Sequence, residues 1–134
     1  MAHATLHWVE GKRFIGVDST NHSVVLSTPD EGVGMKPSDL LLVALASCSA
    51  VDVVDILRKK RIELTKLQVE VNGEQDADPP WTFRKVQLKY FAIGQGLTEK
   101  DLEQTIELSM EKYCSVAATI RGVAQITTEF EIQS

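Results

Sequence analysis

The chain has 134 residues, of which 43% are hydrophobic and 25% are charged, and its formal net charge at pH 7 is −5. This length predicts one domain, residues 1–134, that can bury a core without disulfide bonds. The composition excludes a disordered or fibrous protein. The negative net charge argues against a sequence-independent nucleic-acid binder, because contacts to phosphates need a basic surface.

The amino terminus lacks the basic region and apolar core of a signal peptide, so we expect none. The longest uncharged run lies between Asp39 and Asp52, and its twelve residues fall short of the ~20 that a membrane-spanning helix needs. We therefore expect a cytoplasmic protein that is not inserted in a membrane. In the cytoplasm, two cysteines are expected to be catalytic or simply buried rather than joined in a structural disulfide.

Three short strands are predicted at the start of the chain, over residues 3–9, 13–17 and 22–27. Apolar and polar residues alternate in the first segment, and turn-forming residues separate the three. Together they indicate an antiparallel meander. A loop rich in glycine and proline follows, over residues 28–36.

A long helix is predicted between Met35 and Arg61, with Ser38 as its amino-terminal cap and Asp39 in its first turn. Apolar residues occur on every side of this helix from Leu40 to Leu57, which predicts burial all round. Three strands cannot cover such a helix. A second sheet, a second helix or a partner subunit must therefore contribute.

The second half of the chain predicts a hairpin, two helical segments and a last strand. The hairpin strands cover residues 64–71 and 81–92, and the first helix begins after Thr98 and extends to about Tyr113. A short helical segment over 116–120, with Ser115 as its cap, and a strand over 123–132 complete the chain. The resulting order is β-β-β-α-β-β-α-β, which is an α+β fold.

Cys48 lies about ten residues into the long helix, beyond the reach of the helix dipole. An apolar setting alone would raise the pKa of its thiol and leave it inert, as in many buried free cysteines. To be reactive, Cys48 needs a cation from another element. Arg13, at the start of the second strand, is a candidate, although an exposed turn residue is the plainer reading of this arginine.

Cys114 lies at a helix junction, directly before the expected cap Ser115. A thiolate there could gain from backbone N–H groups. One buried thiol and one junction thiol would suit a peroxidatic and a resolving pair, but spacing alone does not show that they meet. The pair is not a C-x-x-C motif, and two cysteines do not make a cysteine zinc site.

Three segments together resemble the OsmC/Ohr family (osmotically inducible protein C and organic hydroperoxide resistance protein). The helix P-S-D-L-L-L-V-A-L-A-S-C-S-A-V-D-V-V-D-I-L-R-K-K-R resembles the first cysteine helix of the family, and E-K-Y-C-S-V-A-A-T-I resembles its second cysteine motif. The segment G-K-R-F lies where the family carries an arginine. The element order also fits, and the pattern A-L-x-x-C-S/T-A is closest to the OsmC-like branch.

This resemblance implies a reaction and an assembly. Cys48 would be the peroxidatic thiol that reduces a small organic hydroperoxide and becomes a sulfenic acid. Cys114 would resolve it as a disulfide, and Arg13 would stabilise the Cys48 thiolate. No cofactor would be bound, and an external dithiol, in some members a lipoyl group on a protein, would reduce the disulfide. The family folds as an intertwined homodimer, which would also cover the apolar helix.

One position departs from the family pattern. Well-studied members place a glutamate directly after the helix-opening proline, where it pairs with the arginine, and this chain has Ser38 there. The nearest acid is Asp39, which lies roughly 180° from Cys48 around the helix at about 100° per residue. Asp39 would have to orient Arg13 from the first turn, or a different acid must do so.

A second hypothesis is a non-catalytic dimer that binds a small apolar ligand and whose cysteines are inert. It predicts slow alkylation of the thiols at pH 7 and no peroxide consumption with any dithiol. The pKa of Cys48 separates the two hypotheses, because a value above that of a free thiol favours the binding module.

Overall fold

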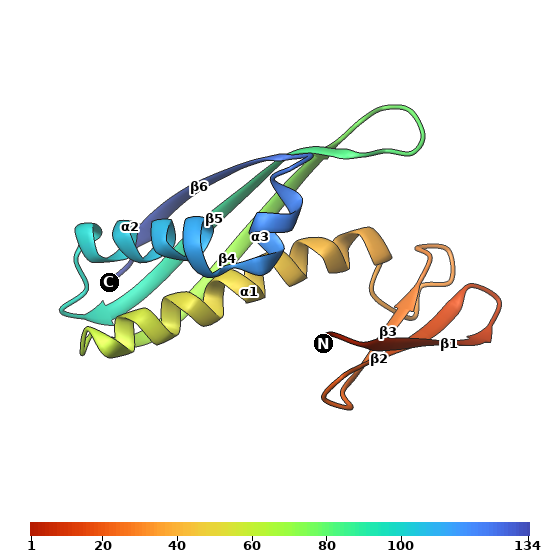
Figure 1. Ribbon diagram of the computed structural model, residues 1–134, viewed down its shortest axis with the longest axis horizontal. Coiled ribbons are helices and arrows are strands. Elements are labelled where there is room, and N and C mark those ends of the chain that lie inside the picture. Colours follow the sequence, from red (N-terminus) through yellow and green to blue (C-terminus); the bar gives the residue numbers. More distant parts are fainter. The chain divides into compact units, whose positions relative to one another are not determined.

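The computed structural model describes residues 1–134 and divides into two compact units, Met1–Leu41 and Leu42–Ser134. The elements follow the predicted order, except that three consecutive helical segments take the place of the second helix (Figure 1). The α+β class is therefore confirmed. That residues 1–134 act as one domain stays a prediction, and each unit is described below by itself.

The first unit contains a three-stranded antiparallel sheet in the order β1-β2-β3. Its strands are β1 (Ala4–Glu10), β2 (Arg13–Asp18) and β3 (Ser23–Ser27). The predicted meander is thus confirmed. Every residue of β1 is exposed, whereas in β3 the side chains of Leu26 and Ser27 are buried. This sheet has little core of its own.

Helix α1 (Pro37–Lys59) starts one residue before the predicted cap. The carbonyl of Lys36 accepts hydrogen bonds from the backbone N–H groups of Asp39 and Leu40, so Lys36 precedes the first turn and Ser38 lies within it. Proline is favoured at the first helical position because its missing N–H would have no partner there. The expectation that Ser38 caps the helix was therefore wrong.

Within one chain, α1 buries a single stripe of side chains, spaced four residues apart: Leu45, Ser49, Val53 and Leu57. On the other side of the helix, the side chains of Val43 and Val51 are 46% and 63% exposed. One chain thus does not provide the burial all round that the apolar composition predicts. By length and composition alone α1 could also cross a membrane, a test that core helices of soluble proteins pass too.

The second unit places helices against one face of a second sheet, in the order β4-β5-β6. Its strands are β4 (Glu63–Gln75), β5 (Phe83–Gln95) and β6 (Gln125–Ile132). Strands β4 and β5 form the predicted hairpin and β6 runs parallel to β5. Alternate residues of β5 are buried in the core: Val86, Leu88, Tyr90 and Ala92. Figure 1 shows α2 (Glu99–Leu108) over this sheet.

The hairpin strands are longer than predicted, since the segment 73–75 pairs with β5 rather than forming a loop. At the start of α2, Thr98 caps the helix as expected, and its Oγ1 accepts a hydrogen bond from the backbone N–H of Asp101 at 3.1 Å. Helix α2 ends earlier than predicted. It continues into a π-helical turn, η1 (Ser109–Tyr113), and then into α3 (Ser115–Ile120).

Candidate functional site

The π-helical turn decides which residue after α2 faces the core. The backbone N–H of Cys114 donates to the carbonyl of Ser109 at 2.8 Å, five residues earlier instead of four. Such a turn accommodates one extra residue and is frequent at functional sites. The buried face of the helix therefore passes from Ser109 to Cys114, while Tyr113 is 54% exposed. The expectation that Tyr113 continues the apolar face of α2 was wrong for this reason.

Cys114 itself caps α3. Its backbone is extended, and its Sγ accepts a hydrogen bond from the N–H of Ala117 at 3.4 Å. Ser115, the expected cap, is instead the first residue of the helix. A cap must stand outside the helix with non-helical backbone angles, and only Cys114 does so here. The side chain of Cys114 is 2% exposed.

Cys48 packs against the core cluster that contains Cys114 in the second unit, and each thiol perturbs the pKa of the other. Burial raises the pKa of the Cys48 thiol. Hydrogen bonds from the backbone of Val116, from the Cys114 thiol, and from the side chain and backbone of Ser115 outweigh burial, and hold the pKa below its ordinary value. These donors stabilise a thiolate, which is the nucleophilic form of cysteine.

Cys114 has the opposite character. Burial raises the pKa of its thiol to about 11, and the hydrogen bond and negative charge of Cys48 act in the same direction. The two thiols therefore differ, since the pKa of Cys48 lies below its ordinary value and that of Cys114 lies above it. A low-pKa cysteine beside a protonated partner can attack an electrophile and then be resolved as a disulfide.

In the first unit, Arg13 is held by two carboxylates. Its Nε lies 2.6 Å from Oε2 of Glu31, and its Nη1 lies 3.1 Å from Oε1 of Glu10. The hydrogen bond and charge of Glu31 raise the pKa of Arg13, and the Arg13 hydrogen bond lowers the pKa of Glu31. The expected pairing of Arg13 with Asp39 is not made. The acid that pairs with Arg13 is Glu31, which lies in the loop before α1 and not in the first turn of α1.

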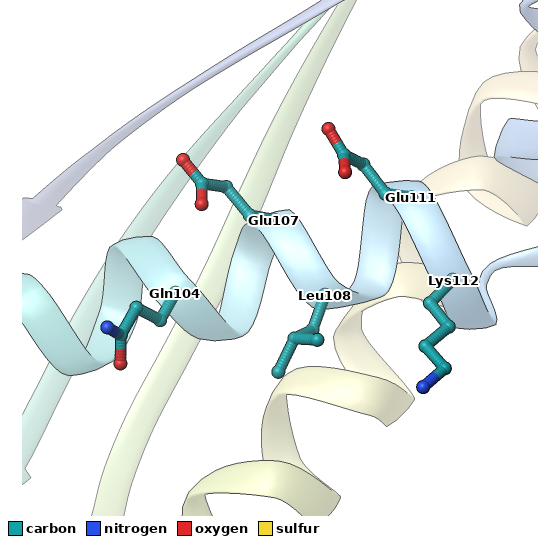
Figure 2. A pocket seen from close by; sticks show the side chains of 5 residues that line it. All are labelled: Gln104, Glu107, Leu108, Glu111 and Lys112. Atoms are coloured by element: carbon teal, nitrogen blue, oxygen red, sulfur yellow. The ribbon is translucent and has the colours of Figure 1, made fainter.

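A pocket of about 570 Å³ is lined by residues of α2 and η1, and neither cysteine is among them. Figure 2 shows the five side chains that line it: Gln104, Glu107, Leu108, Glu111 and Lys112. Four of the five are polar or charged, which does not suit an apolar peroxide. This pocket contains none of the residues predicted for the site.

A family profile described as "OsmC-like protein" matches residues 28–129, which is most of the chain. The chain belongs to the OsmC-like family. The resemblance to the OsmC/Ohr family that the cysteine motifs indicated is therefore confirmed.

Relatives of this OsmC-like chain match over nearly its whole length. Protein YhfA of Escherichia coli strain K12 is 31% identical over 129 residues, and the match covers 96% of each chain. A hypothetical protein from Aquifex aeolicus has a TM-score of 0.89 at 31% identity, with 99% of this chain and 96% of that chain covered. An organic hydroperoxide resistance protein OsmC from Legionella pneumophila has a TM-score of 0.66 and covers 98% and 96% of the two chains. At 18% identity it shows the shared fold.

Sequence reasoning missed several residues around this OsmC-like site. No sequence pattern marked Glu31 as the partner of Arg13, because Glu31 lies in a loop 18 residues away along the chain. Ser115 was taken for a helix cap, whereas its backbone and hydroxyl contact Cys48. Ser49 and Ser109 were not singled out, although the helical spacing of Ser109 from Leu102 could have marked it as buried.

Proposed function

We propose that this protein is a thiol-dependent peroxidase that reduces small organic hydroperoxides. The observation that carries the proposal is the asymmetric thiol pair, in which Cys48 has a lowered pKa and contacts the protonated thiol of Cys114. The family supports the proposal, since some proteins with this fold are named organic hydroperoxide resistance proteins.

In the first step, the Cys48 thiolate attacks the terminal oxygen of the hydroperoxide. An S–O bond forms, the O–O bond breaks, and the departing alkoxide takes a proton from water to become an alcohol. Cys48 is thereby oxidised to a sulfenic acid. In the second step, the sulfur of Cys114 attacks the Cys48 sulfur and forms the disulfide. The hydroxyl group leaves with the proton of Cys114 as water.

An external dithiol then reduces the disulfide by thiol exchange, and a lipoyl group on a protein is one donor of this kind. The first exchange releases one cysteine as a thiol and leaves the donor bound to the other in a mixed disulfide. The second thiol of the donor then releases that cysteine, and the donor leaves as a disulfide. No bound cofactor is needed for these steps. We place the reaction in the cytoplasm, without nucleic acid or membrane as partners.

Arg13 is proposed to stabilise the Cys48 thiolate, as the family resemblance implies. The guanidinium stays charged at all relevant pH values. Its two carboxylate partners, Glu31 and Glu10, fix its orientation within the first unit. We assign the orienting role to Glu31, because its ion pair with Arg13 is the shorter and less exposed of the two.

We further propose a homodimer. In the first unit, β1 exposes large apolar side chains to solvent, and those of Leu6 and Trp8 are 60% and 69% exposed. On α1, Val43, Val51 and Val54 form an exposed stripe. Apolar surface of this extent on a small chain is typical of a surface that a partner covers, and a second copy is the partner that the family resemblance implies.

The proposal is tested by following consumption of a small organic hydroperoxide with a dithiol as electron donor. The wild-type protein should turn over. Cys48→Ser should not react, because the remaining thiol of Cys114 is buried and, with its pKa raised to about 11, stays protonated. Without the dithiol, Cys114→Ser should consume one equivalent of peroxide and then carry a sulfenic acid that a trapping reagent labels. Peroxide consumption that persists in Cys48→Ser would refute the assignment.

One observation favours the alternative of an apolar-ligand binder. The first unit has a pocket of about 520 Å³ whose lining includes Leu6, Val17, Val24 and Leu26. The same experiment separates the two functions. A binding module would consume no peroxide with any dithiol, and its thiols would be alkylated slowly at pH 7.

A further inference from the structure

A buried chain of hydroxyl groups crosses the second unit close to the two cysteines. Tyr90 Oη lies 2.6 Å from Ser49 Oγ, which lies 3.0 Å from Ser109 Oγ. Ser109 Oγ lies in turn 2.8 Å from Oδ2 of Asp52. Tyr90, Ser49 and Ser109 are each 0% exposed, and only Asp52 reaches partly to solvent.

The carboxylate of Asp52 anchors one end of this chain. The Ser109 hydroxyl donates towards Asp52 and also towards Ser49, and in the bond between Ser49 and Tyr90 either hydroxyl can be the donor. Burial raises the pKa of Tyr90 to about 12, so its phenol keeps its proton.

Ser109 joins the two cysteine-bearing segments. Its side chain is held by Ser49 and Asp52 of α1, and Ser49 is the residue next to Cys48. Its backbone carbonyl accepts the N–H of Cys114 through the π-helical bond. A displacement of Ser109 from α1 would therefore move Cys114 relative to Cys48. Such a displacement is resisted, because it would leave buried hydroxyl groups without hydrogen-bond partners.

We propose that Ser109 is a positioning residue that holds Cys114 in the place from which it can bond to Cys48, with Ser49 and Asp52 fixing the Ser109 hydroxyl. The inference deepens the proposed function, and it rests on that function for the organic hydroperoxide as the physiological oxidant. It concerns only the closure of the disulfide, where the rate depends on how well the two sulfurs are held together.

Closure can be measured without peroxide, with oxidised glutathione as the probe. The Cys48 thiolate attacks one sulfur of the glutathione disulfide, forms a mixed disulfide and releases one glutathione thiolate. Cys114 then loses its proton to solvent, attacks the Cys48 sulfur and releases the second glutathione thiolate. The first step is isolated in a Cys114→Ser background, and the second is followed by mass spectrometry after rapid quenching.

Ser109→Ala should slow the second step by about tenfold, which corresponds to the loss of one buried hydrogen bond, and should leave the first step unchanged. Ser109→Thr, which keeps a hydroxyl, should restore most of the rate. Ser47→Ala is the matched control, since Ser47 also adjoins Cys48 but is exposed and bonds only to the carbonyl of Ala44. The Ser47→Ala variant should form the disulfide at the wild-type rate.

If Ser109→Ala does not fold, Asp52→Ala tests the same chain from its partly exposed end and should also slow closure. The inference would be overturned if a folded Ser109→Ala or Asp52→Ala variant formed the disulfide at the wild-type rate. It would also be overturned if the rates of both steps fell equally. The two proposals can fail separately. If the wild-type protein consumes no peroxide but Ser109→Ala forms the disulfide slowly, only the peroxidase function is refuted. If the wild-type protein is an active peroxidase but Ser109→Ala forms the disulfide at the normal rate, only the positioning role is refuted.

Discussion

The two cysteines differ because of the groups around each sulfur, not because of burial alone. Burial raises the pKa of both thiols. At Cys48 the N–H and O–H donors of the segment Cys114–Val116 reverse this effect, whereas at Cys114 the neighbouring sulfur adds to it. The short segment that begins with Cys114 is therefore also the segment that lowers the pKa of Cys48.

This asymmetry predicts a selective alkylation profile. With iodoacetamide, Cys48 should react with a midpoint below the ~8.5 of a free cysteine thiol, because its thiolate is stabilised. Cys114, whose pKa is raised to about 11, should stay unlabelled through pH 9. Peptide mass spectrometry after timed quenching measures both rates. Equal labelling of the two thiols, or a Cys48 midpoint above that of a free thiol, would favour the binding module.

Glu31→Gln should reduce peroxidase turnover by about tenfold, a change of one decade in rate constant, if Glu31 orients Arg13. The matched control Asp39→Asn should retain turnover, because Asp39 makes no ion pair with Arg13. Steady-state rates at saturating dithiol provide the comparison. A loss in Asp39→Asn with none in Glu31→Gln would restore the original assignment.

The same substitution has a stability signature in acid. Arg13 lowers the folded-state pKa of Glu31, so the ion pair stabilises the protein above the unfolded carboxyl pKa of ~4.3 and this contribution is lost as pH falls through the lower folded value. Wild type should thus exceed Glu31→Gln in urea stability at pH 7. The difference should vanish in strong acid.

At the residue scale, the sequence singled out the two thiols and Arg13 as candidates but not the acid that pairs with Arg13. Cys48, Cys114 and Arg13 belong to short motifs that can be recognised locally. Glu31 approaches Arg13 only after the loop that follows β3 folds back, where the N–H of Lys12 also donates to its Oε1 at 3.3 Å. No local pattern marks such a long-range pairing.

At the scale of elements, the strands and the start of α2 were predictable, whereas the caps of α1 and α3 and the end of α2 were not. Alternation and the turn residues between segments identified the six strands, and Thr98 identified the start of α2. The sequence pattern does not predict the π-helical turn, because apolar residues at helical spacing extend through Met110 to Tyr113 as they would in a continuous α-helix. The extra residue is detected only through the bond from Cys114 to Ser109.

The turn between β1 and β2 depends on Gly11, which has φ of 52°. An added Cβ would also lie 2.6 Å from Oε1 of Glu31. Gly11→Ala should therefore destabilise the fold by ~1 kcal/mol through backbone strain and displace Glu31 as well. Urea unfolding measures the first effect, and turnover the second.

Gly96→Ala is the matched control for this turn, since Gly96 has φ of 78° but open space around the position of a Cβ. It should show the backbone effect on stability and keep full turnover. If both variants lose turnover equally, Gly11 has no special relation to Glu31.

At the scale of the whole molecule, the sequence indicated that α1 needs more cover than one chain gives, and its exposed valines agree with this. The sequence could not identify what supplies the cover, because an apolar surface does not specify its partner. The homodimer that we propose is what the family resemblance implies.

Val51→Glu places a charge in the middle of the exposed stripe of α1, where the wild-type side chain is 63% exposed. If this stripe is a dimer interface, the variant should sediment as a monomer and the wild type as a dimer, since an unpaired charge in an interface is strongly unfavourable. Gln87→Glu, on the exposed face of β5, adds the same charge and should remain dimeric. A monomeric wild type would contradict the homodimer.

The central claim is that Cys48 and Cys114 act as one redox pair, and disulfide mapping tests it most directly. Reduced protein is treated with one equivalent of a small organic hydroperoxide, alkylated, digested without reductant and analysed by mass spectrometry. We predict a peptide linked through Cys48 and Cys114, which disappears after treatment with a dithiol. Peroxide consumption without that linked peptide, or recovery of both thiols unmodified, would contradict the account.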